Sequence, residues 1–548
     1  MFDLAHLDPL PPVIPGRDAV PLPDARAIRR LGAGFCARHA VLPLRAQAGV
    51  QPLAVADPDR YTLVAARIRA VLGETVPLPA DRAEVMAGLT RHAGLTLARE
   101  AEERCPPDRS CRELRVAPAL ALGLTVLLAG AICLAPGSAL FIGQFLAAGL
   151  LAVQTALYLV AMIPHRSGQA LRPPLAGLPT ISLFLPLYHE QDIAPMLLER
   201  IEALDYPRDR LEVWLIMECD DRVTAQAISR VALPPWAHVL TVAPGEVQTK
   251  PRAMNVALDF CRGSIVGVYD AEDAPEPDQL RRVAARFAAA KPNVAALQGR
   301  LSFYNTRATW LTRCFSIDYA AWFWMILPAI GRLGWPIPLG GTTIFLRRDA
   351  LESVGGWDAH NVTEDADLGL RLARAGWRTE LIDSVTLEEA TARPRAWIKQ
   401  RSRWQKGYAI TWAAHMRHPL RLIRDLGPWG FVGVHVLFLG SLVGAALAPL
   451  LWPFWLLLAA APVPYAPVLP LQAVWIVQVG LGLMLAVQAS GLVIALSRQS
   501  RLALVRWLPA MMLYYPLATI SLGKAVAELV TRPFYWDKTA HGVTRPDS

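Results

Sequence analysis

The sequence predicts an α/β domain with a largely parallel sheet, placed between segments that are apolar enough to span a membrane. Residues 116–164 contain no charged side chain, and none of Asp, Glu, Lys or Arg occurs between Asp425 and Arg498. Between these two stretches, apolar strand patterns alternate with helical patterns. That alternation is typical of strand–helix units that build a parallel sheet.

The composition supports a membrane protein of several domains. Of 548 residues, 53% are hydrophobic and only 18% are charged, and the chain carries 17 Trp. The net charge of +9 suits contact with anionic lipid or an anionic ligand. No basic stripe or nucleic-acid motif occurs, so we expect no nucleic-acid partner. Seven dispersed Cys fit a reduced cytoplasmic compartment better than a disulfide framework.

The first half of the chain divides into a polar block and an apolar hairpin. Residues 1–115 are rich in Arg, Ala and Pro and begin without the pattern of a cleaved signal peptide. Residues 116–164 are long enough for two membrane helices of about 20 residues each. Pro136-Gly137 is the expected break between them. Because basic residues flank both ends, both ends are predicted to be cytoplasmic.

Residues 178–415 are predicted to form the α/β domain, with strands at ISLFLPLY, LEVWLIME and GSIVGVYD. Ligands of such sheets bind at the carboxyl ends of the strands. The region 428–496 then holds two transmembrane helices, around 428–450 and 471–496, with room for a third near Pro449 and Pro453. Residues 507–530 are apolar but carry Lys524 and Glu528, which predicts an interfacial helix or a complete span. Residues 531–548 form a tail.

Four polar clusters follow the predicted strands or open loops. In the first, Glu190 is placed to accept a hydrogen bond from an N–H of a base while Tyr188 packs on that base. The alternative is a solvated loop without a ligand. In the second, Asp220 and Asp221 follow a strand, where adjacent carboxylates need a cation or a donor.

The third cluster, Asp270-Ala-Glu272-Asp273, predicts a metal site. Three carboxylates in four residues beside an apolar strand need a counter-charge. Mg²⁺ or Mn²⁺ that also binds a diphosphate supplies it, because hard cations take carboxylate and phosphate oxygens together. The alternative is an acidic helix N-terminus.

The fourth cluster is Glu364-Asp365, ahead of a helical pattern, and QRSRW follows it in the chain. Asp365 is predicted to be a general base for an acceptor hydroxyl, with an N-terminal helix cap as the alternative. In QRSRW, Gln400 suits hydroxyls, Arg403 suits phosphate and Trp404 offers a flat face to a sugar ring. A basic flank before a membrane helix is the other interpretation.

In this order the motifs resemble the family 2 glycosyltransferases, specifically the membrane-embedded, inverting, processive kind typified by cellulose and hyaluronan synthases. The resemblance covers roughly residues 115–545 and implies a glycosyltransferase A-type, Rossmann-like domain in the cytoplasm. LPLYHE resembles the opening nucleotide-binding strand, CDD the nucleoside contact and YDAED the metal-binding DxD element. Glu272 stands at the second Asp position of that element, which leaves open whether Glu272 or Asp273 reaches the metal.

The resemblance also implies roles for further residues. TKPRAMN resembles the segment that faces the diphosphate, which places Lys250 and Asn255 there. TED resembles the catalytic-base motif with Glu364 and Asp365, and QRSRW the motif in which the Arg touches the diphosphate and the Trp touches the acceptor. LGGTTIFLRRDAL resembles the segment at the acceptor end of the cleft. FYWDKTAHG resembles a gating loop over the nucleotide, with Trp536, Lys538 and Thr539 as its candidates.

The residues of YDAED and FYWDKTAHG are similar to those of the branch named phage-adsorption protein B. That branch is associated with export of a surface polysaccharide. The N-terminal block resembles the N-terminal domain of type II secretion ATPases. Related domains bind cyclic di-GMP through a segment led by the residues that stand here as Arg30, Leu31 and Gly32. A structural or docking domain is the alternative.

We therefore expect a multi-pass protein of the bacterial inner membrane that uses a nucleotide sugar, taken to be UDP-linked, to extend and translocate a β-linked polysaccharide. Its expected partners are the lipid bilayer, the growing polysaccharide and an outer-envelope export protein. The alternatives are transfer of a single sugar to a polyprenyl phosphate and a non-catalytic receptor for cyclic di-GMP or phage.

Overall fold

The structure is a computed structural model, and it divides the chain into two compact units, Met1–Leu97 and Ala98–Ser548. It describes residues 22–47, 49–114, 123, 126–127, 130, 132–163, 177–190, 193–451 and 471–535. Much of the first predicted membrane helix, the region around Pro453, and Trp536, Lys538 and Thr539 therefore lie outside the described residues. The two units are described separately.

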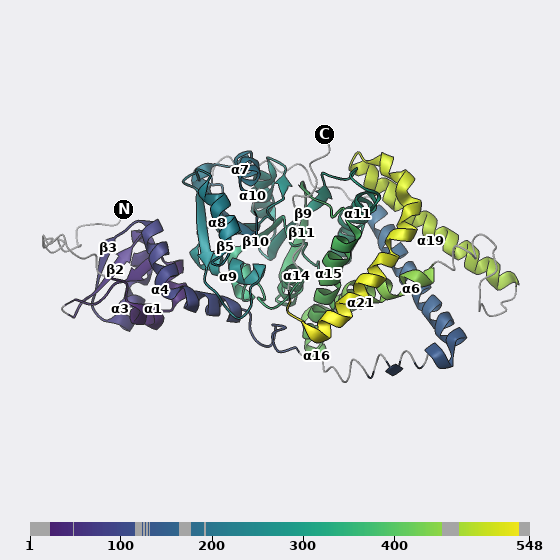
Figure 1. Cartoon of the computed structure of the whole chain (residues 1–548), viewed down its shortest axis with the longest axis horizontal. Coiled ribbons are helices and arrows are strands. Elements are labelled where there is room, and N and C mark those ends of the chain that lie inside the picture. The colour runs from purple at the N-terminus through teal and green to yellow at the C-terminus, as the bar shows by residue number, and fades with distance from the viewer. Residues whose placement is uncertain are drawn as a thin grey trace. The chain divides into compact units, whose positions relative to one another are not determined.

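The first unit is a small α+β domain (Figure 1). Its sheet has the order β1-β2-β3, with β1 antiparallel and β3 parallel to the central β2. The side chains of Asp24 and Asp57 accept hydrogen bonds from backbone N–H groups at the starts of α1 and α3 and so cap these helices. The elements in order are α1 (Ala25–Leu31), α2 (Ala33–Arg38), β1 (Val41–Pro43), β2 (Gln51–Val55), α3 (Pro58–Leu72), β3 (Thr75–Pro79) and α4 (Arg82–Glu103), the last of which continues into the second unit.

The second unit is built on an eight-stranded sheet of order β6-β5-β4-β7-β10-β9-β11-β8. The three strands expected from the sequence are present, and LEVWLIME forms a strand over its whole length. Both faces of this sheet are covered, so the inner strands are buried on both sides. The strands are β4 (Ile181–Leu187), β5 (Leu211–Glu218), β6 (Ala237–Val242), β7 (Ile265–Val268), β8 (Ala274–Pro275), β9 (Val294–Phe303), β10 (Ile344–Arg347) and β11 (Arg378–Glu388).

The sheet is more mixed than the sequence predicts. The strands β6, β5, β4 and β7 are parallel to one another, and β9 is parallel to β11. However, β10 is antiparallel to both β7 and β9, and β8 is antiparallel to β11. A short strand that is buried on both faces gives the same apolar run in either direction, so its sequence does not reveal the direction.

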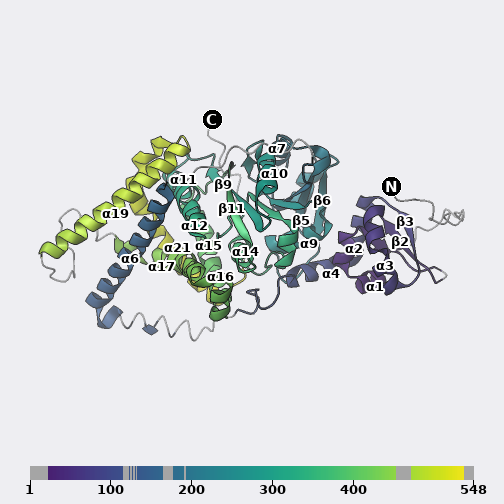
Figure 2. The same ribbon diagram turned by 180° about the vertical axis from the view of Figure 1, so that it is seen from behind.

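Helices cover the sheet and join it to the apolar end of the unit (Figures 1 and 2). One core cluster lies around β4, β5, β7 and α10, and a second joins α11, α12 and α15 to the apolar helices. The helices are α7 (Ile193–Glu202), α8 (Arg222–Ser229), α9 (Lys250–Phe260), α10 (Gln279–Ala289), α11 (Trp310–Ala321), α12 (Leu327–Leu333), α13 (Arg348–Ser353), α14 (Glu364–Arg374) and α15 (Pro394–His415), with short turns η1 (Arg208–Arg210) and η2 (Trp322–Ile326).

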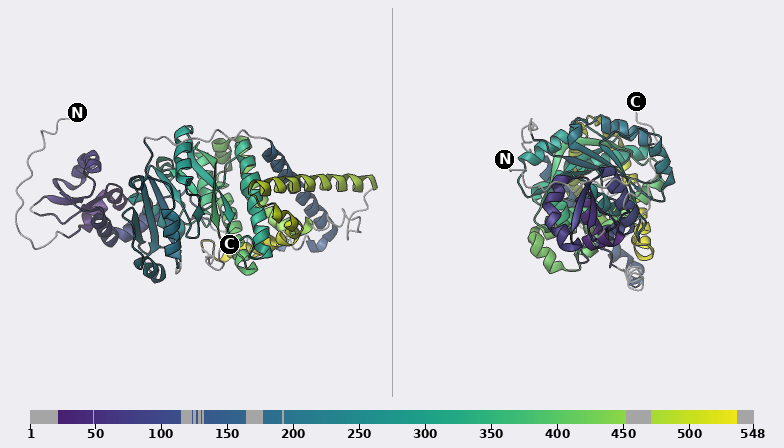
Figure 3. Two further views of the ribbon diagram at one scale, coloured as in Figure 1. Left: turned by 90° about the horizontal axis from the view of Figure 1, so that it is seen from above. Right: turned by 90° about the vertical axis from the view of Figure 1, so that its left-hand side faces the viewer.

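The apolar helices gather at one end of the second unit (Figure 2), and α19 projects beyond the others (Figure 3). Among the residues that the structure describes, four helical stretches are long and apolar enough to cross a membrane, namely Pro136–Met162, Trp310–Leu333, Pro419–Leu450 and Trp475–Arg498. The stretch Trp310–Leu333 is mostly buried within the protein and was not expected as a span. The elements are α6 (Pro136–Met162), α16 (Pro419–Val434), η3 (His435–Leu439), α17 (Gly440–Leu447), η4 (Ala448–Leu451), α19 (Leu471–Arg498), η5 (Leu502–Ala510), α20 (Met511–Tyr514) and α21 (Pro516–Thr531).

Candidate active site

A large cavity of about 1720 Å³ runs through the described part of the second unit. One part is lined by polar residues that follow the carboxyl ends of β4, β6 and β7, by Glu218 at the end of β5 and by the start of α14. The other part is lined by apolar residues of α6, α17 and α19. The cavity therefore connects the polar edge of the sheet with helices apolar enough to span a membrane.

The loop after β4 brings Tyr188 and Glu190 to the cavity wall. Asp221 fixes this loop, because its Oδ2 accepts a hydrogen bond of 2.6 Å from the backbone N–H of His189. Asp221 also caps α8 by accepting from the backbone and hydroxyl of Thr224. These bonds lower the pKa of Asp221 although burial acts in the opposite direction. Asp221 thus has a structural role in shaping the loop.

Asp220 lies beside Asp221 but has a different partner. Its Oδ1 accepts a hydrogen bond of 2.8 Å from Nε2 of Gln248, which belongs to the loop ahead of α9. Gln248 lines the cavity, whereas neither Asp220 nor Asp221 is among the described lining residues. The pair predicted to contact a nucleoside therefore organises two loops that do line the cavity.

Lys250 begins α9 and points to the carboxylates that follow β7. Its Nζ lies 2.5 Å from Oδ1 of Asp270 and donates to the carbonyl oxygen of Gly341 at 2.9 Å. Burial by itself lowers the pKa of Lys250. The carboxylates of Asp270, Glu364 and Asp365 have the larger, opposite effect, so the pKa lies above its usual value. Lys250 is therefore a charged lysine shared by both acidic clusters.

Asn255, which the resemblance places beside Lys250 at the diphosphate, lies elsewhere. It is fully buried, and its amide donates to the carbonyl oxygens of Ala101 and Trp357 at 3.0 and 2.7 Å. Its Oδ1 accepts from the backbone of Trp357. Since its side chain has these partners and does not reach the described cavity lining, Asn255 is not part of the site proposed below.

The turn after β7 separates the roles of the three carboxylates Asp270, Glu272 and Asp273. Asp270 and Glu272 line the cavity. Asp273 is 1% exposed, and its Oδ2 accepts from the backbone of Asp270 and from the hydroxyl of Thr342. Asp273 thus holds the turn in shape, and this geometry favours Glu272 over Asp273 as the second residue facing a ligand.

Two further residues, which no sequence motif marks, support this turn. Arg200 of α7 donates to the carbonyl oxygen of Glu272 at 2.6 Å and so ties the turn to that helix. Glu388, at the end of β11, lines the cavity. Burial and the nearby Asp273, Glu272 and Asp270 raise the pKa of Glu388 well above its usual value. Only the pairing of β11 with β8 and β9 brings this glutamate to the turn, so no local motif marks it.

The acidic cluster fits a divalent cation that also binds a ligand from outside the protein. Burial and the neighbouring carboxylates raise the pKa of Asp273, and its Oδ1 has no hydrogen-bond partner among the described residues. A cation would offset this crowding of negative charge. No three His, Cys, Asp or Glu side chains in the described part of the chain form a ready-made metal cage. Asp270 and Glu272 would therefore hold the ion together with oxygens of a ligand.

Glu364 and Asp365 form the first turn of α14 at the cavity wall. Burial raises the pKa of Asp365 to about 6, against the opposing effects of backbone N–H groups, Lys250 and Arg403. Burial and the adjacent Asp365 raise the pKa of Glu364 to about 8. Asp365 therefore has the pKa of a base that is ionised at neutral pH and still accepts a proton readily.

The helix α15 carries Gln400, Arg403 and Trp404 to the same cavity. Gln400 accepts a hydrogen bond of 3.0 Å from the hydroxyl of Thr391. The helix lies very close to the start of α14 at Gly407, where an added Cβ would stand 2.3 Å from Oγ1 of Thr363. This glycine therefore permits the contact that brings the QRSRW motif beside Glu364 and Asp365.

Arg401 of the same motif has an anchoring role. Its guanidinium pairs with Asp318 of α11, donates to the hydroxyl of Tyr514 at 3.0 Å and stacks over the ring of Trp404, 4.8 Å from its centroid. The sequence alone does not indicate this role of Arg401. These contacts fix α15 against the apolar helices and orient Trp404.

In the first unit, Arg30, Leu31 and Gly32 form the junction of α1 and α2. Arg30 is exposed and donates to the carbonyl oxygen of Val71, Leu31 is buried, and Gly32 has a φ of 93°, which favours glycine. Arg30 is therefore the member of this trio with an accessible side chain.

Two parts of the chain match known protein families. Residues 265–526 match the family described as glycosyl transferase family group 2, and residues 17–99 match the MshEN domain. The chain contains a family 2 glycosyltransferase domain. That prediction and the glycosyltransferase A-type fold are confirmed, and an MshEN domain precedes the catalytic part.

The curated relatives are glycosyltransferases. A β-monoglucosyldiacylglycerol synthase from a Synechocystis species is 30% identical over 286 residues, which are 50% of this chain and 58% of the relative. A probable glucomannan 4-β-mannosyltransferase from Arabidopsis thaliana is 27% identical over 42% of this chain and 43% of its own length. The chain thus spans about half the length of these relatives.

Among solved structures, a mannosyltransferase from Pyrobaculum calidifontis in complex with GDP-mannose and Mn²⁺ is 21% identical, with a TM-score of 0.45. The match covers 71% of this chain and 99% of that one. The similarity to the phage-adsorption branch and to type II secretion ATPases stays a prediction.

Proposed function

We propose that the protein is an inverting glycosyltransferase that moves a sugar from a nucleotide diphosphate to an acceptor hydroxyl at a membrane. The observation that carries this proposal is the shared cavity. It is lined by Lys250 at the start of α9, by Asp270 after β7, and by Glu364 and Asp365 at the start of α14. Such a transfer needs a positive charge that binds the phosphates, carboxylates that can hold a metal ion, and a base for the acceptor hydroxyl.

In this proposal Asp365 removes the proton of the acceptor hydroxyl as its oxygen attacks the anomeric carbon. The bond from that carbon to the diphosphate breaks, and the nucleoside diphosphate leaves. Lys250 and Arg403 stabilise the negative charge that develops on the departing diphosphate. Tyr188 and Glu190 bind the base, which we expect to be uracil.

In this proposal Asp270 and Glu272 would hold Mg²⁺ or Mn²⁺. The ion, when bound, neutralises charge on the diphosphate. Arg200 and Asp273 maintain the shape of the turn that carries both ligands.

For the acceptor we propose a growing β-linked polysaccharide at the inner membrane. Trp404 is half-buried in the cavity wall and offers its ring to a sugar, which supports this assignment. The cavity continues among α6, α17 and α19, where a product chain would pass the bilayer. Export through an outer-envelope partner would follow.

A second candidate acceptor is a lipid hydroxyl or lipid phosphate. The part of the cavity near the apolar helices is lined mainly by aliphatic side chains, among them Leu150, Leu151, Leu481 and Leu485. Such a wall suits an acyl or isoprenoid chain. The similarity to a glucosyl-diacylglycerol synthase also favours this candidate.

The experiment uses the full chain in detergent with a panel of nucleotide sugars and Mg²⁺ or Mn²⁺. We expect release of nucleoside diphosphate from one donor, and loss of that release in Asp365→Asn. If the product is a polymer, it will form a ladder on a gel. A product that partitions into organic solvent would instead identify the lipid acceptor. Metal-dependent donor binding without any transfer would indicate that a partner or acceptor is missing, whereas the absence of donor binding would contradict the proposed transfer.

We further propose that the MshEN domain binds cyclic di-GMP and that Arg30 contributes its exposed guanidinium. Titration of the full chain with cyclic di-GMP tests this. Binding that is equal in wild type and Arg30→Ala would contradict the role of Arg30. The absence of binding in wild type would favour a docking domain.

A further inference from the structure

The last residues of α4 and the segment that follows it pack behind the polar end of the cavity. The carboxylate of Glu102 lies 3.5 Å from Nη1 of Arg252, and Glu218 lies 2.5 Å from Nη2 of the same arginine. Arg252 is 0% exposed, and both carboxylates are buried. Because a buried guanidinium is costly without partners, these two carboxylates hold α9 in its position.

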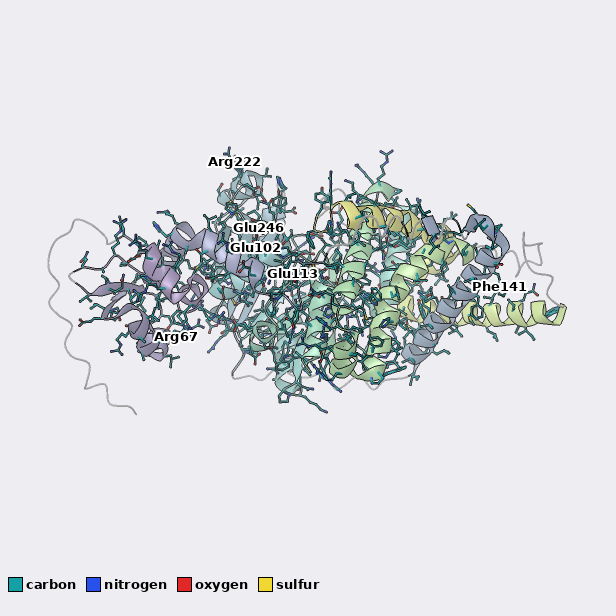
Figure 4. The ribbon with its side chains drawn as sticks, turned by 90° about the horizontal axis from the view of Figure 1, so that it is seen from below. Arg67, Glu102, Glu113, Phe141, Arg222 and Glu246 are labelled. Atoms are coloured by element: carbon teal, nitrogen blue, oxygen red, sulfur yellow. The ribbon has the colours of Figure 1, made fainter. Side chains whose placement is uncertain are left out.

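Glu102 also holds the loop that precedes α9. Its Oε1 accepts a hydrogen bond of 3.2 Å from the backbone N–H of Val247. At Gly245 an added Cβ would stand 2.1 Å from Oε1 of Glu102 and 2.2 Å from Nη1 of Arg252. Loop, carboxylate and guanidinium are therefore in close contact, and Figure 4 labels Glu102 beside Glu246 of this loop.

The groups that Glu102 holds are part of the cavity wall. Val247, Gln248, Thr249 and Lys250 all line it, and so does Glu218. Lys250 lies two positions before Arg252 on α9 and reaches Asp270. Glu102 itself is not among the described lining residues, so its influence on the site must pass through the loop and Arg252.

The contact is one of several along the same segment. The amide of Asn255 donates to the carbonyl oxygen of Ala101, and Arg104 pairs with Asp259 on α9. Farther along, the hydroxyl of Ser110 and the backbone N–H of Cys111 both donate to the carboxylate of Asp358, at 2.9 and 2.7 Å. These bonds make residues 101–111 an integral part of the second unit, and they account for the buried position of Asn255.

We propose that Glu102 is a positioning residue of the donor site, which sets the loop before α9 and, through Arg252, the lysine that binds the diphosphate. This inference rests on the proposed function of the cavity. The catalytic domain then includes residues 101–111, which precede the apolar stretch 116–164 in the chain. Its positioning contact lies on α4, the helix that begins in the MshEN unit.

The test compares Glu102→Gln with Glu103→Gln in the full chain. Glu103 is the adjacent residue and is exposed, so it controls for the loss of one negative charge. We expect Glu102→Gln to raise the KM for the donor about three- to thirtyfold, with a smaller change in kcat, because the affected groups bind the diphosphate. Glu102→Asp should recover part of the loss. Calorimetric titration with a nucleoside diphosphate should show the same ranking.

A second variant approaches the same contact from the loop. Gly245→Ala places a methyl group against Glu102 and Arg252, so it should also raise the KM for the donor. Equal KM values in Glu102→Gln and Glu103→Gln would overturn the proposal. It would equally be overturned if Glu102→Gln and Gly245→Ala lowered only the amount of folded protein. If wild type neither binds nor turns over any nucleotide, the proposed function itself fails.

Discussion

Nζ of Lys250 lies 2.5 Å from Oδ1 of Asp270, so the first predicted metal ligand is already paired with a positive charge. The lysine also donates to Gly341, whose absent side chain leaves room for Asp365, since an added Cβ would stand 3.1 Å from Oδ2 of that residue. Lys250 therefore links the acidic turn after β7 with the candidate base on α14. A bound diphosphate would share this lysine with Asp270.

Replacement of Lys250 by Met should weaken the binding of a nucleoside diphosphate about tenfold or more, because a charge-assisted hydrogen bond is lost. Binding of the corresponding nucleoside should change little. Calorimetric titration of both ligands checks this. Lys291→Met, at an exposed lysine, is the control. Equal losses for nucleoside and nucleoside diphosphate would show that Lys250 does not face the phosphates.

Asp365→Asn should reduce kcat by about 10²- to 10⁴-fold, since a general base contributes that much, while donor affinity stays within a few-fold of wild type. Release of nucleoside diphosphate and donor titration measure the two effects. Asp209→Asn removes an exposed carboxylate and should behave as wild type. A kcat within tenfold of wild type would assign the base to another group.

Activity should rise with pH through an apparent pKa near 6, because Asp365 works only when deprotonated and burial raises its pKa to about 6. Lys250 lowers this pKa, so removal of its positive charge should move the rise to higher pH. Profiles of kcat/KM for wild type and Lys250→Met check both statements. A wild-type profile whose acid limb lies near pH 4, or a shift to lower pH in the variant, would contradict this assignment.

Variants of the acidic turn should separate metal ligands from the structural carboxylate. Asp270→Asn and Glu272→Gln should raise the concentration of Mn²⁺ needed for half-maximal activity without lowering thermal stability. Asp273→Ala should instead lower the free energy of unfolding by about 1–3 kcal/mol, because the backbone of Asp270 and the hydroxyl of Thr342 lose their buried acceptor. Metal titrations measure the first effect, and thermal melting curves measure the second. The assignment fails if Glu272→Gln leaves the metal requirement unchanged.

Gly407→Ala should destabilise the protein by about 1–3 kcal/mol through overpacking against Thr363, and should also reduce activity because Asp365 follows on the same turn. Thermal melting and the transfer assay measure both. In Gly523→Ala an added Cβ meets nothing within 4 Å, so this variant is the matched control on α21. Wild-type stability and activity in Gly407→Ala would show that the two helices tolerate a wider separation.

Local patterns were sufficient for the strands and for several residues that line the cavity. The strands β4 and β5 are apolar runs bounded by turns, and the polar residues after them lie at the sheet edge where ligands of parallel sheets bind. Tyr188, Lys250, Asp270, Asp365 and Arg403 all reach the cavity. Asn255 does not, because its spacing from Lys250 on α9 specifies a helix face but not the segment that packs against that face.

The sequence by itself determined the kind of protein: apolar stretches around an α/β domain, with acidic and basic motifs in an order that indicates a glycosyltransferase. These features are encoded by neighbouring residues, whose periodicity and chemistry act locally. Only the tertiary structure decided that Asp273 and Asp221 are structural, that Glu388 belongs to the acidic turn and that Glu102 lies behind Lys250. Burial and hydrogen-bond partners depend on strand pairing and on contacts between residues far apart in the chain, which no local pattern specifies.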